Sequence, residues 1–434
     1  MNRLPVVCFS LFISGLTFAA AAPKNIILLI GDGMGEAEIA LTRAYEFDGE
    51  AGLFVDTMKN SGSVIVKQLM DDPSKIEFSG SSGSGGTTIS TGNRTSEGRV
   101  AVKAEDGSHY KTILEEAQEL GFKTGLVATS IIADATPATF AAHTQNRYCY
   151  MQGLKDCEEY GETPIIEQML DQNVDVMLGG GYNLLPTNTD ENITVKEKAE
   201  RNGYTVITTR DELMNIEVGT KTLGVFSDGT MPVEWQGPGG KGADFIAVDE
   251  KRNIILPQAA ACEVNPAHAD MPRLEEIANY AIESLHNADG AGFFLMIEGA
   301  SIDKQAHDAK PCGVIGEMLA FDRTVKMAVE YAQRHGNTAV IVTADHGQAT
   351  QVIYKPVADD GPESRDHLPG LYQLLLTKGG NELGAYYGTN NLDDQSHTGV
   401  NIPIFTYGLD NPEALTGVIQ QTEIYGVMKD FLFN

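Results

Sequence analysis

Short apolar runs rich in β-branched residues alternate along the chain with amphipathic segments of helical periodicity. Six of these runs are NIILLI (25–30), TGLVATS (124–130), VDVML (174–178), GFFLMIE (292–298), TAVIVTA (338–344) and IPIFTY (402–407). The segments between them include PRLEEIANYAIESLHNA and GEMLAFDRTVKMAVEYAQRHG. Strands that are apolar on both faces must be covered on both sides, because a strand facing water alternates polar with apolar residues. The pattern predicts an α/β fold, a three-layer α/β/α sandwich with a large, mostly parallel central sheet and helices on both faces.

The N-terminal residues 1–21 have the composition of a signal peptide. A basic start at Arg3 precedes an apolar run over residues 6–18 and small residues at 19–22, the order that suits a signal peptidase. The apolar run is too short to span a bilayer, and no other segment approaches the roughly 20 apolar residues of a membrane helix. We therefore expect a periplasmic or secreted protein.

The remaining residues, 22–434, are expected to form a single domain. The chain has 434 residues, 42% of them hydrophobic, which is enough to bury a large core, and no internal repeat is visible. Residues from about 182 to 271 are irregular and contain WQGPGGKGAD. We expect an insertion or a cap region there.

The chain is strongly acidic, with a formal net charge of −29 from 31 basic and 60 acidic residues. Such a surface repels nucleic acid and anionic membranes, so neither is an expected partner. An anionic substrate would need local positive charge, which metal ions can supply. The acidity is also compatible with a halophilic source.

Four cysteines remain once the signal peptide with Cys8 is removed: Cys149, Cys157, Cys262 and Cys312. An even number in an exported chain predicts two disulfides, with three possible connectivities. A local loop between Cys149 and Cys157 is the simplest pair. A zinc site is the alternative, although the chain contains no CxxC motif.

Polar side chains follow four of the expected strands directly. They are Asp32 after the first run; Asp134, Thr136 and Arg147 after the second; Glu298, Asp303, Lys304 and His307 at the end of the fourth; and Asp345 and His346 after the fifth. In a parallel sheet the binding crevice lies outside the carboxyl ends of the strands. We therefore expect these groups to converge on one edge of the sheet.

Each of these motifs has a simple structural interpretation by itself. The GDG around Asp32 is typical of a tight turn, EGASIDKQAHD is typical of a solvated helix start, and His397 in DDQSHTG alone indicates little. The combination is more specific, because Asp303 and His307 lie four residues apart and share a face if the segment is helical. Together the carboxylates and histidines predict two sites of mixed nitrogen and oxygen ligands suited to zinc and one oxygen site suited to magnesium. Paired metals clamp in-line displacement at phosphorus, and the Arg147 fork would match two phosphate oxygens.

Five motifs taken together resemble one known family. NIILLIGDGMG, DATPATFAAHTQNR, FFLMIEGASIDKQAHDAKPCG, VIVTADHG and SHTG occur in this order and strongly resemble the bacterial periplasmic alkaline phosphatases. The similarity runs from about Lys24 to the end and is weakest across residues 182–261. It implies hydrolysis of phosphate monoesters through a covalent phosphoserine, a broad substrate range, two zinc ions, one magnesium ion and a homodimer.

The resemblance also implies a role for each matching residue. One zinc ion would be held by Asp303, His307 and His397, and the other by Asp32, Asp345, His346 and a serine nucleophile. The magnesium ion would be held by Asp32, Thr136 and Glu298. Asp134 and Lys304 would lie beside the magnesium ion and the phosphate, which Arg147 would grip. The implied disulfides join Cys149 to Cys157 and Cys262 to Cys312.

The serine nucleophile is expected in FSGSSGSGGTTISTGN (78–93), which by itself reads like a flexible linker. In the family the nucleophile stands ten residues before the glycine of an STG tripeptide, which selects Ser82 and leaves Ser81 and Ser84 as alternatives. Ser81 replaces the aspartate usual in the family, so Arg147 is expected to lose one ion-pair partner and to hold phosphate more loosely. The glycines after Ser82 predict a soft helix start, for which cold adaptation is a plausible reason.

Two other classes of function are compatible with the same fold. A phosphodiesterase or a sulfatase is the nearest, although none of the four cysteines lies in the C/S-x-P/A-x-R context that sulfatases require. A metal- or phosphate-binding protein that has lost catalysis is the other, suggested by the altered serine stretch.

Overall fold

The computed structural model describes residues 24–434 apart from 152, 251–253, 287–289 and 354–369. The expected signal peptide, residues 1–21, lies outside the described residues and stays a prediction. Within the described part of the chain, no helix is long and apolar enough to cross a membrane.

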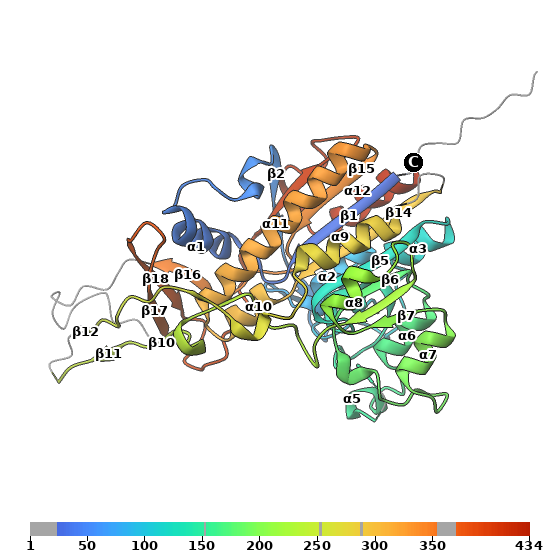
Figure 1. The fold of residues 1–434 in the computed structure, drawn as a ribbon, viewed down its shortest axis with the longest axis horizontal. Helices are drawn as coiled ribbons and strands as arrows, with labels where there is room; N and C mark the ends of the chain where they lie inside the picture. Colours follow the sequence, from blue (N-terminus) through green and yellow to red (C-terminus); the bar gives the residue numbers. More distant parts are fainter. Residues whose placement is uncertain (1–23, 152, 251–253, 287–289, 354–369) are drawn as a thin grey trace, which may run out of the picture.

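A ten-stranded sheet forms the centre of the molecule (Figure 1). In spatial order its strands are β20 (Gly417–Gln420), β2 (Asn60–Ile65), β19 (Ile402–Tyr407), β15 (Thr338–Thr343), β1 (Lys24–Gly31), β14 (Gly292–Gly299), β5 (Lys123–Ile131), β6 (Val176–Gly180), β8 (Thr222–Val225) and β7 (Thr205–Ile207). Only β19 runs antiparallel to its two neighbours, β15 and β2, and the other pairs are parallel. The expected mostly parallel α/β fold is confirmed.

Two groups of helices cover this sheet. One group contains α1 (Glu36–Phe47), α9 (Leu274–Leu285) and α11 (Pro311–His335); α9 and α11 pack on the central strands, and α11 packs on both α9 and α1 (Figure 1). The other group contains α2 (Ser82–Thr91), α3 (Ile113–Glu119), α4 (Ala135–Ala141) and α12 (Thr422–Phe433). Because both faces are covered, β1 is buried along its length from Asn25 to Gly31, which explains its continuous apolar sequence.

The range expected to be irregular, 182–271, divides into two parts. Its first part contains α7 (Val195–Arg201) and α8 (Arg210–Asn215) and contributes β7 and β8 to the central sheet. From β8 to residue 271, the described residues form only turns, short 3-10 helices and two-residue strands, among them β9 (Trp235–Gln236) and β13 (Glu263–Val264). A separate four-stranded sheet lies beside α1, with its strands in the order β10 (Asp244–Phe245), β17 (Leu371–Leu376), β18 (Glu382–Tyr387) and β16 (Thr350–Ile353).

Two disulfides fasten loops to this framework. Cys149 pairs with Cys157 inside a local loop, and Cys262 pairs with Cys312 at the start of α11. The expected pairing is confirmed, and a zinc site made from these cysteines is excluded.

Candidate active site

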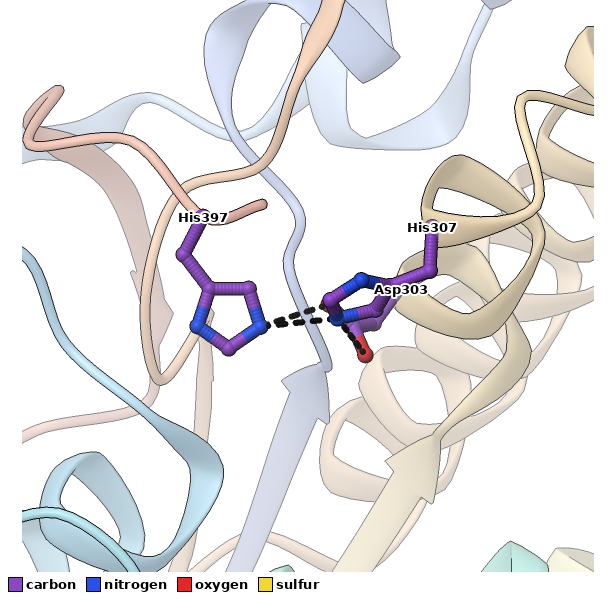
Figure 2. A group of neighbouring side chains, drawn as sticks. All are labelled: Asp303, His307 and His397. Carbon is purple, nitrogen blue, oxygen red and sulfur yellow. Dashed lines mark hydrogen bonds and ion pairs between the residues drawn. The ribbon is translucent and has the colours of Figure 1, made fainter. Parts of the chain in front are cut away.

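A first group of potential metal ligands contains Asp303, His307 and His397 (Figure 2). Helix α10 (Ser301–His307) begins directly after β14 and presents Asp303 and His307 on one face, while His397 comes from the loop before β19. The two imidazole Nε2 atoms lie 2.9 Å apart, and each lies 3.4 Å from a carboxylate oxygen of Asp303.

The hydrogen bonds of these two histidines show that the group suits a cation. His307 Nδ1 faces the carbonyl oxygen of Gln395, and His397 Nδ1 lies 2.8 Å from the carbonyl oxygen of Gly80. A carbonyl only accepts, so in the neutral imidazoles each Nδ1 carries the proton. Both Nε2 lone pairs then point at each other and at a carboxylate, an arrangement that a metal ion stabilises.

A second group lies deeper and shares Asp303 with the first. Its ligand atoms from Asp32, Asp303 and His346 all lie within 4.8 Å of one another. His346 Nε2 is 3.2 Å from Asp32 Oδ1 and 3.4 Å from Asp345 Oδ2, and both carboxylate oxygens are buried without a hydrogen-bond partner. Buried oxygens of this kind are costly unless a cation compensates them.

The second group brings several buried carboxylates around a single imidazole. Burial, with added repulsion from Asp303 and Asp345, raises the pKa of Asp32 to about 7. Burial opposes a charged imidazole at His346, but Asp345 and Asp32 outweigh it and raise the pKa of His346 to about 10. In the metal-free protein these groups therefore retain protons that a divalent cation would displace.

A third group offers oxygen atoms only. Glu298 Oε2 accepts a hydrogen bond of 3.0 Å from Ser130, and the neighbouring Thr136 hydroxyl is buried without a partner. Burial, together with the charges of Asp32 and Asp134, raises the pKa of Glu298 to about 8. An all-oxygen set of this kind suits magnesium better than zinc.

Asp134 joins the two cationic side chains of the site. Its Oδ1 accepts a hydrogen bond of 2.9 Å from Arg147 Nη2, and its Oδ2 accepts one of 2.8 Å from Lys304 Nζ. Burial alone would raise the pKa of Asp134, but Lys304 and Arg147 hold it well below its usual range. Asp134 thus supplies an ion-pair partner for Arg147 although position 81 is serine; looser binding of phosphate than in relatives with aspartate there stays a prediction.

Of the three candidate serines, Ser82 faces a different direction from the other two. Ser82 is the first residue of α2, and its Oγ lies 3.4 Å from His346 Nε2. The hydroxyls of Ser81 and Ser84 instead hydrogen-bond the side-chain oxygen of Gln68 and lie 3.2 Å from each other. Among these serines, the geometry favours Ser82 as the one that faces the second ligand group.

The alkaline phosphatase family model matches residues 23–391. The chain belongs to this family. Alkaline phosphatase of Escherichia coli (strain K12) is 37% identical over 425 residues, which cover 94% of this chain and 85% of that protein. Streptomycin-6-phosphate phosphatase of Streptomyces griseus is also 37% identical, covering 94% of this chain and 90% of that protein.

Solved alkaline phosphatase structures share the fold. A variant of TAB5 alkaline phosphatase with magnesium bound in its M3 site superposes with a TM-score of 0.69 at 27% identity, covering 95% of this chain and 98% of that one. As a member of the alkaline phosphatase family, this chain is an enzyme, a phosphoric monoester hydrolase. The family predicted from the five sequence motifs is therefore confirmed.

Two side chains that contact the site were not among the residues predicted from the sequence. Gln348 Nε2 donates a hydrogen bond of 2.7 Å to Asp303 Oδ1, and Tyr150 donates one of 3.2 Å to Asp134 Oδ1. The only sequence signal is proximity, since Gln348 follows DHG and Tyr150 follows Cys149.

The glycines of α2 have a packing role. Every residue of α2 is buried. A Cβ atom on Gly85 would lie 2.5 Å from the carbonyl oxygen of Asp345, one on Gly83 would lie 2.7 Å from that of Arg99, and one on Gly86 would lie 2.5 Å from the Thr139 hydroxyl. The neighbouring atoms leave no room for a side chain at these three positions. Packing therefore explains the glycines without the expected soft helix start.

We expect Gly85→Ala to destabilise this alkaline phosphatase by about 1–3 kcal/mol, because the methyl group overlaps the Asp345 carbonyl. Activity should fall about 100-fold, since a displacement near 1 Å at a ligand residue can have that effect. Gly426→Ala is the matched control, because this helical glycine in α12 has open space around it and should gain up to about 1 kcal/mol. Thermal unfolding and monoester hydrolysis of both variants measure this, and stabilisation by Gly85→Ala would support the soft-helix hypothesis instead.

Proposed function

We propose that this protein hydrolyses phosphate monoesters through a covalent phosphoserine on Ser82, with two zinc ions and one magnesium ion bound. The observation that carries the proposal is the position of the Ser82 hydroxyl, 3.4 Å from His346 Nε2 and beside buried carboxylate oxygens that lack partners. A serine in this position faces the place where a cation would lower its pKa.

The three ligand groups divide among the ions by the chemistry of their donor atoms. Asp303, His307 and His397 would hold one zinc ion, and Asp32, Asp345 and His346 the other. Asp32, Thr136 and Glu298 would hold magnesium, which is also bound in the TAB5 relative. When bound, the ions neutralise the buried carboxylates, activate the serine and stabilise negative charge on the phosphoryl oxygens.

The protein side chains supply the rest of the reaction. Ser82 Oγ gives up its proton to solvent and attacks phosphorus, so that a bond from Oγ to phosphorus forms. The bond from phosphorus to the alcohol oxygen breaks, and that oxygen takes a proton from water and leaves as the alcohol. Ser82 begins a ten-residue helix, so the N-terminal dipole of α2 favours the negative phosphoryl group. Water then cleaves the phosphoserine and releases inorganic phosphate.

Arg147 is placed to hold the phosphoryl oxygens. One of its nitrogens is bound by Asp134, but its Nε is buried without an acceptor. A phosphate oxygen would satisfy this donor, and Asp134 keeps the guanidinium and the Lys304 ammonium in place. Because these contacts recognise the phosphoryl group and not the alcohol, we propose a broad range of monoesters.

The turnover of chromogenic monoester and diester substrates at alkaline pH, with zinc and magnesium present, tests this function. We expect the monoester to be hydrolysed much faster, because a diester lacks the third non-bridging oxygen that the cations and Arg147 would hold. Preferred hydrolysis of the diester would indicate a phosphodiesterase. Tight binding of phosphate without turnover of either ester would indicate a binding protein.

We further infer that the protein acts as a homodimer in the periplasm or outside the cell. The two disulfides support an oxidising compartment, and the family resemblance supports the dimer. Light scattering of the purified mature protein measures the oligomeric state directly.

A further inference from the structure

The peptide group between Asp345 and His346 belongs to no strand or helix. Strand β15 ends at Thr343, and the residues that follow form a buried loop. The N–H of this peptide donates a hydrogen bond of 3.0 Å to Asp345 Oδ1. Its carbonyl oxygen accepts one of 2.7 Å from the Gln421 side chain. A side chain from the distant C-terminus therefore replaces the partner that a sheet would supply.

Gln421 is directed at this carbonyl and away from its own helix. It occupies the position before α12, and its side chain makes no capping hydrogen bond to that helix. The residue is only 1% exposed, and its Oε1 has no hydrogen-bond partner. A buried amide that is half satisfied is costly. Packing alone would therefore favour an apolar side chain of the same size.

The Asp345 carbonyl oxygen is closely packed by α2 as well as by Gln421. A Cβ on Gly85 of α2 would already be 2.5 Å from this oxygen. Helix α12 in turn packs closely on α2, since a Cβ on Gly92 would lie 2.8 Å from the Tyr425 ring. The carbonyl is thus enclosed between two helices, and one hydrogen bond fixes its direction.

The orientation of this peptide sets two potential ligands at once. Asp345 Oδ1 is occupied by the N–H groups of His346 and Gly33, at 3.0 and 3.1 Å. Its Oδ2 remains without a hydrogen-bond partner, 3.4 Å from His346 Nε2. Rotation of the peptide would break the bond from the His346 N–H to Asp345 Oδ1, which holds the carboxylate in this arrangement, and would loosen the backbone that carries the His346 ring.

We propose that Gln421 is a positioning residue that orients Asp345 and His346 toward the metal of the second ligand group. The inference rests on the proposed function, because it requires a zinc ion at that group. Side chains that orient metal ligands through hydrogen bonds typically change metal affinity by about 10–100-fold when they are removed. The group formed by Asp303, His307 and His397 makes no described contact with Gln421 and should be unaffected.

Zinc titration of the metal-free mature protein against a competing chromogenic chelator tests this positioning role. Gln421→Met keeps the volume, removes the donor and needs no buried partner, so the variant should fold. We expect one of the two zinc equivalents to bind about 10–100-fold more weakly and the other to bind as in the wild type. Asp430→Asn, at an exposed position of the same helix, is the control and should leave both equivalents unchanged.

Thermal unfolding of the same metal-free proteins separates positioning from simple packing. If Gln421→Met binds both zinc equivalents normally but unfolds at a lower temperature, Gln421 only anchors α12 and the inference is wrong. If Gln421→Met fails to fold, Gln421→Asn, which retains a shorter amide, should show the same selective loss of one equivalent. A wild-type protein that binds no zinc would overturn the proposed function itself.

Discussion

Replacement of Ser82 by alanine should lower kcat for a phosphate monoester by about 1,000-fold or more, while zinc binding and folding stay close to those of the wild type. Without the hydroxyl, no phosphoserine can form, and loss of a catalytic nucleophile in other hydrolases has effects of up to about 10⁶-fold. Residual turnover should persist, because Arg147 and the metal ions that the ligand groups would hold can still bind and polarise the phosphoryl group.

Ser81 and Ser84 supply the controls for this prediction. Their hydroxyls face Gln68 and not His346, so Ser81→Ala and Ser84→Ala should retain most of the activity. Ser84→Ala should lose about 1 kcal/mol of stability with its buried hydrogen bonds. A fully active Ser82→Ala variant, with activity lost at Ser81 or Ser84, would move the nucleophile to one of those residues.

Removal of divalent metals should abolish activity, and zinc with magnesium should restore it. The metal-free site holds three carboxylates, Asp32, Asp345 and Glu298, whose pKa values burial raises, and the serine beside them has no cation to activate it. The metals should also raise the unfolding temperature, because they bind the folded protein and not the unfolded chain.

The order in which the metals are returned separates their roles. Zinc alone should restore part of the activity, since it fills the two groups that contain histidine, and magnesium should restore the remainder through the oxygen-only group. Dialysis against chelator followed by monoester assays and calorimetry measures both effects. Full activity in protein shown to be free of metal would contradict the assigned roles of the three groups.

The sequence predicts the central fold because buried strands are recognisable from their composition. All six apolar runs lie in or overlap strands of the ten-stranded sheet. The antiparallel direction of β19 could not be read from its sequence, because a strand with mixed neighbours has the same apolar pattern. Strands β7 and β8 were not predicted within residues 182–271, because strands of three and four residues give little periodic signal.

The sequence places the candidate ligands well because they follow strand ends, which a parallel sheet brings to one edge. It does not show tertiary pairing: the bond between Arg147 and Asp134 depends on where two loops meet. The same holds for Gln421, which reaches Asp345 from 76 residues away in the chain. The glycines of α2 are ambiguous for the same reason, because composition does not distinguish flexibility from close packing.

Trapping of the phosphorylated enzyme tests the central claim most directly. The metal-loaded protein would be mixed with a phosphate monoester, quenched with acid within one turnover and digested for mass spectrometry. The account predicts a phosphoryl group on the peptide that contains Ser82, present in the wild type and absent from Ser82→Ala. Rapid hydrolysis with no phosphorylated peptide, or phosphorylation that persists in Ser82→Ala, would contradict it.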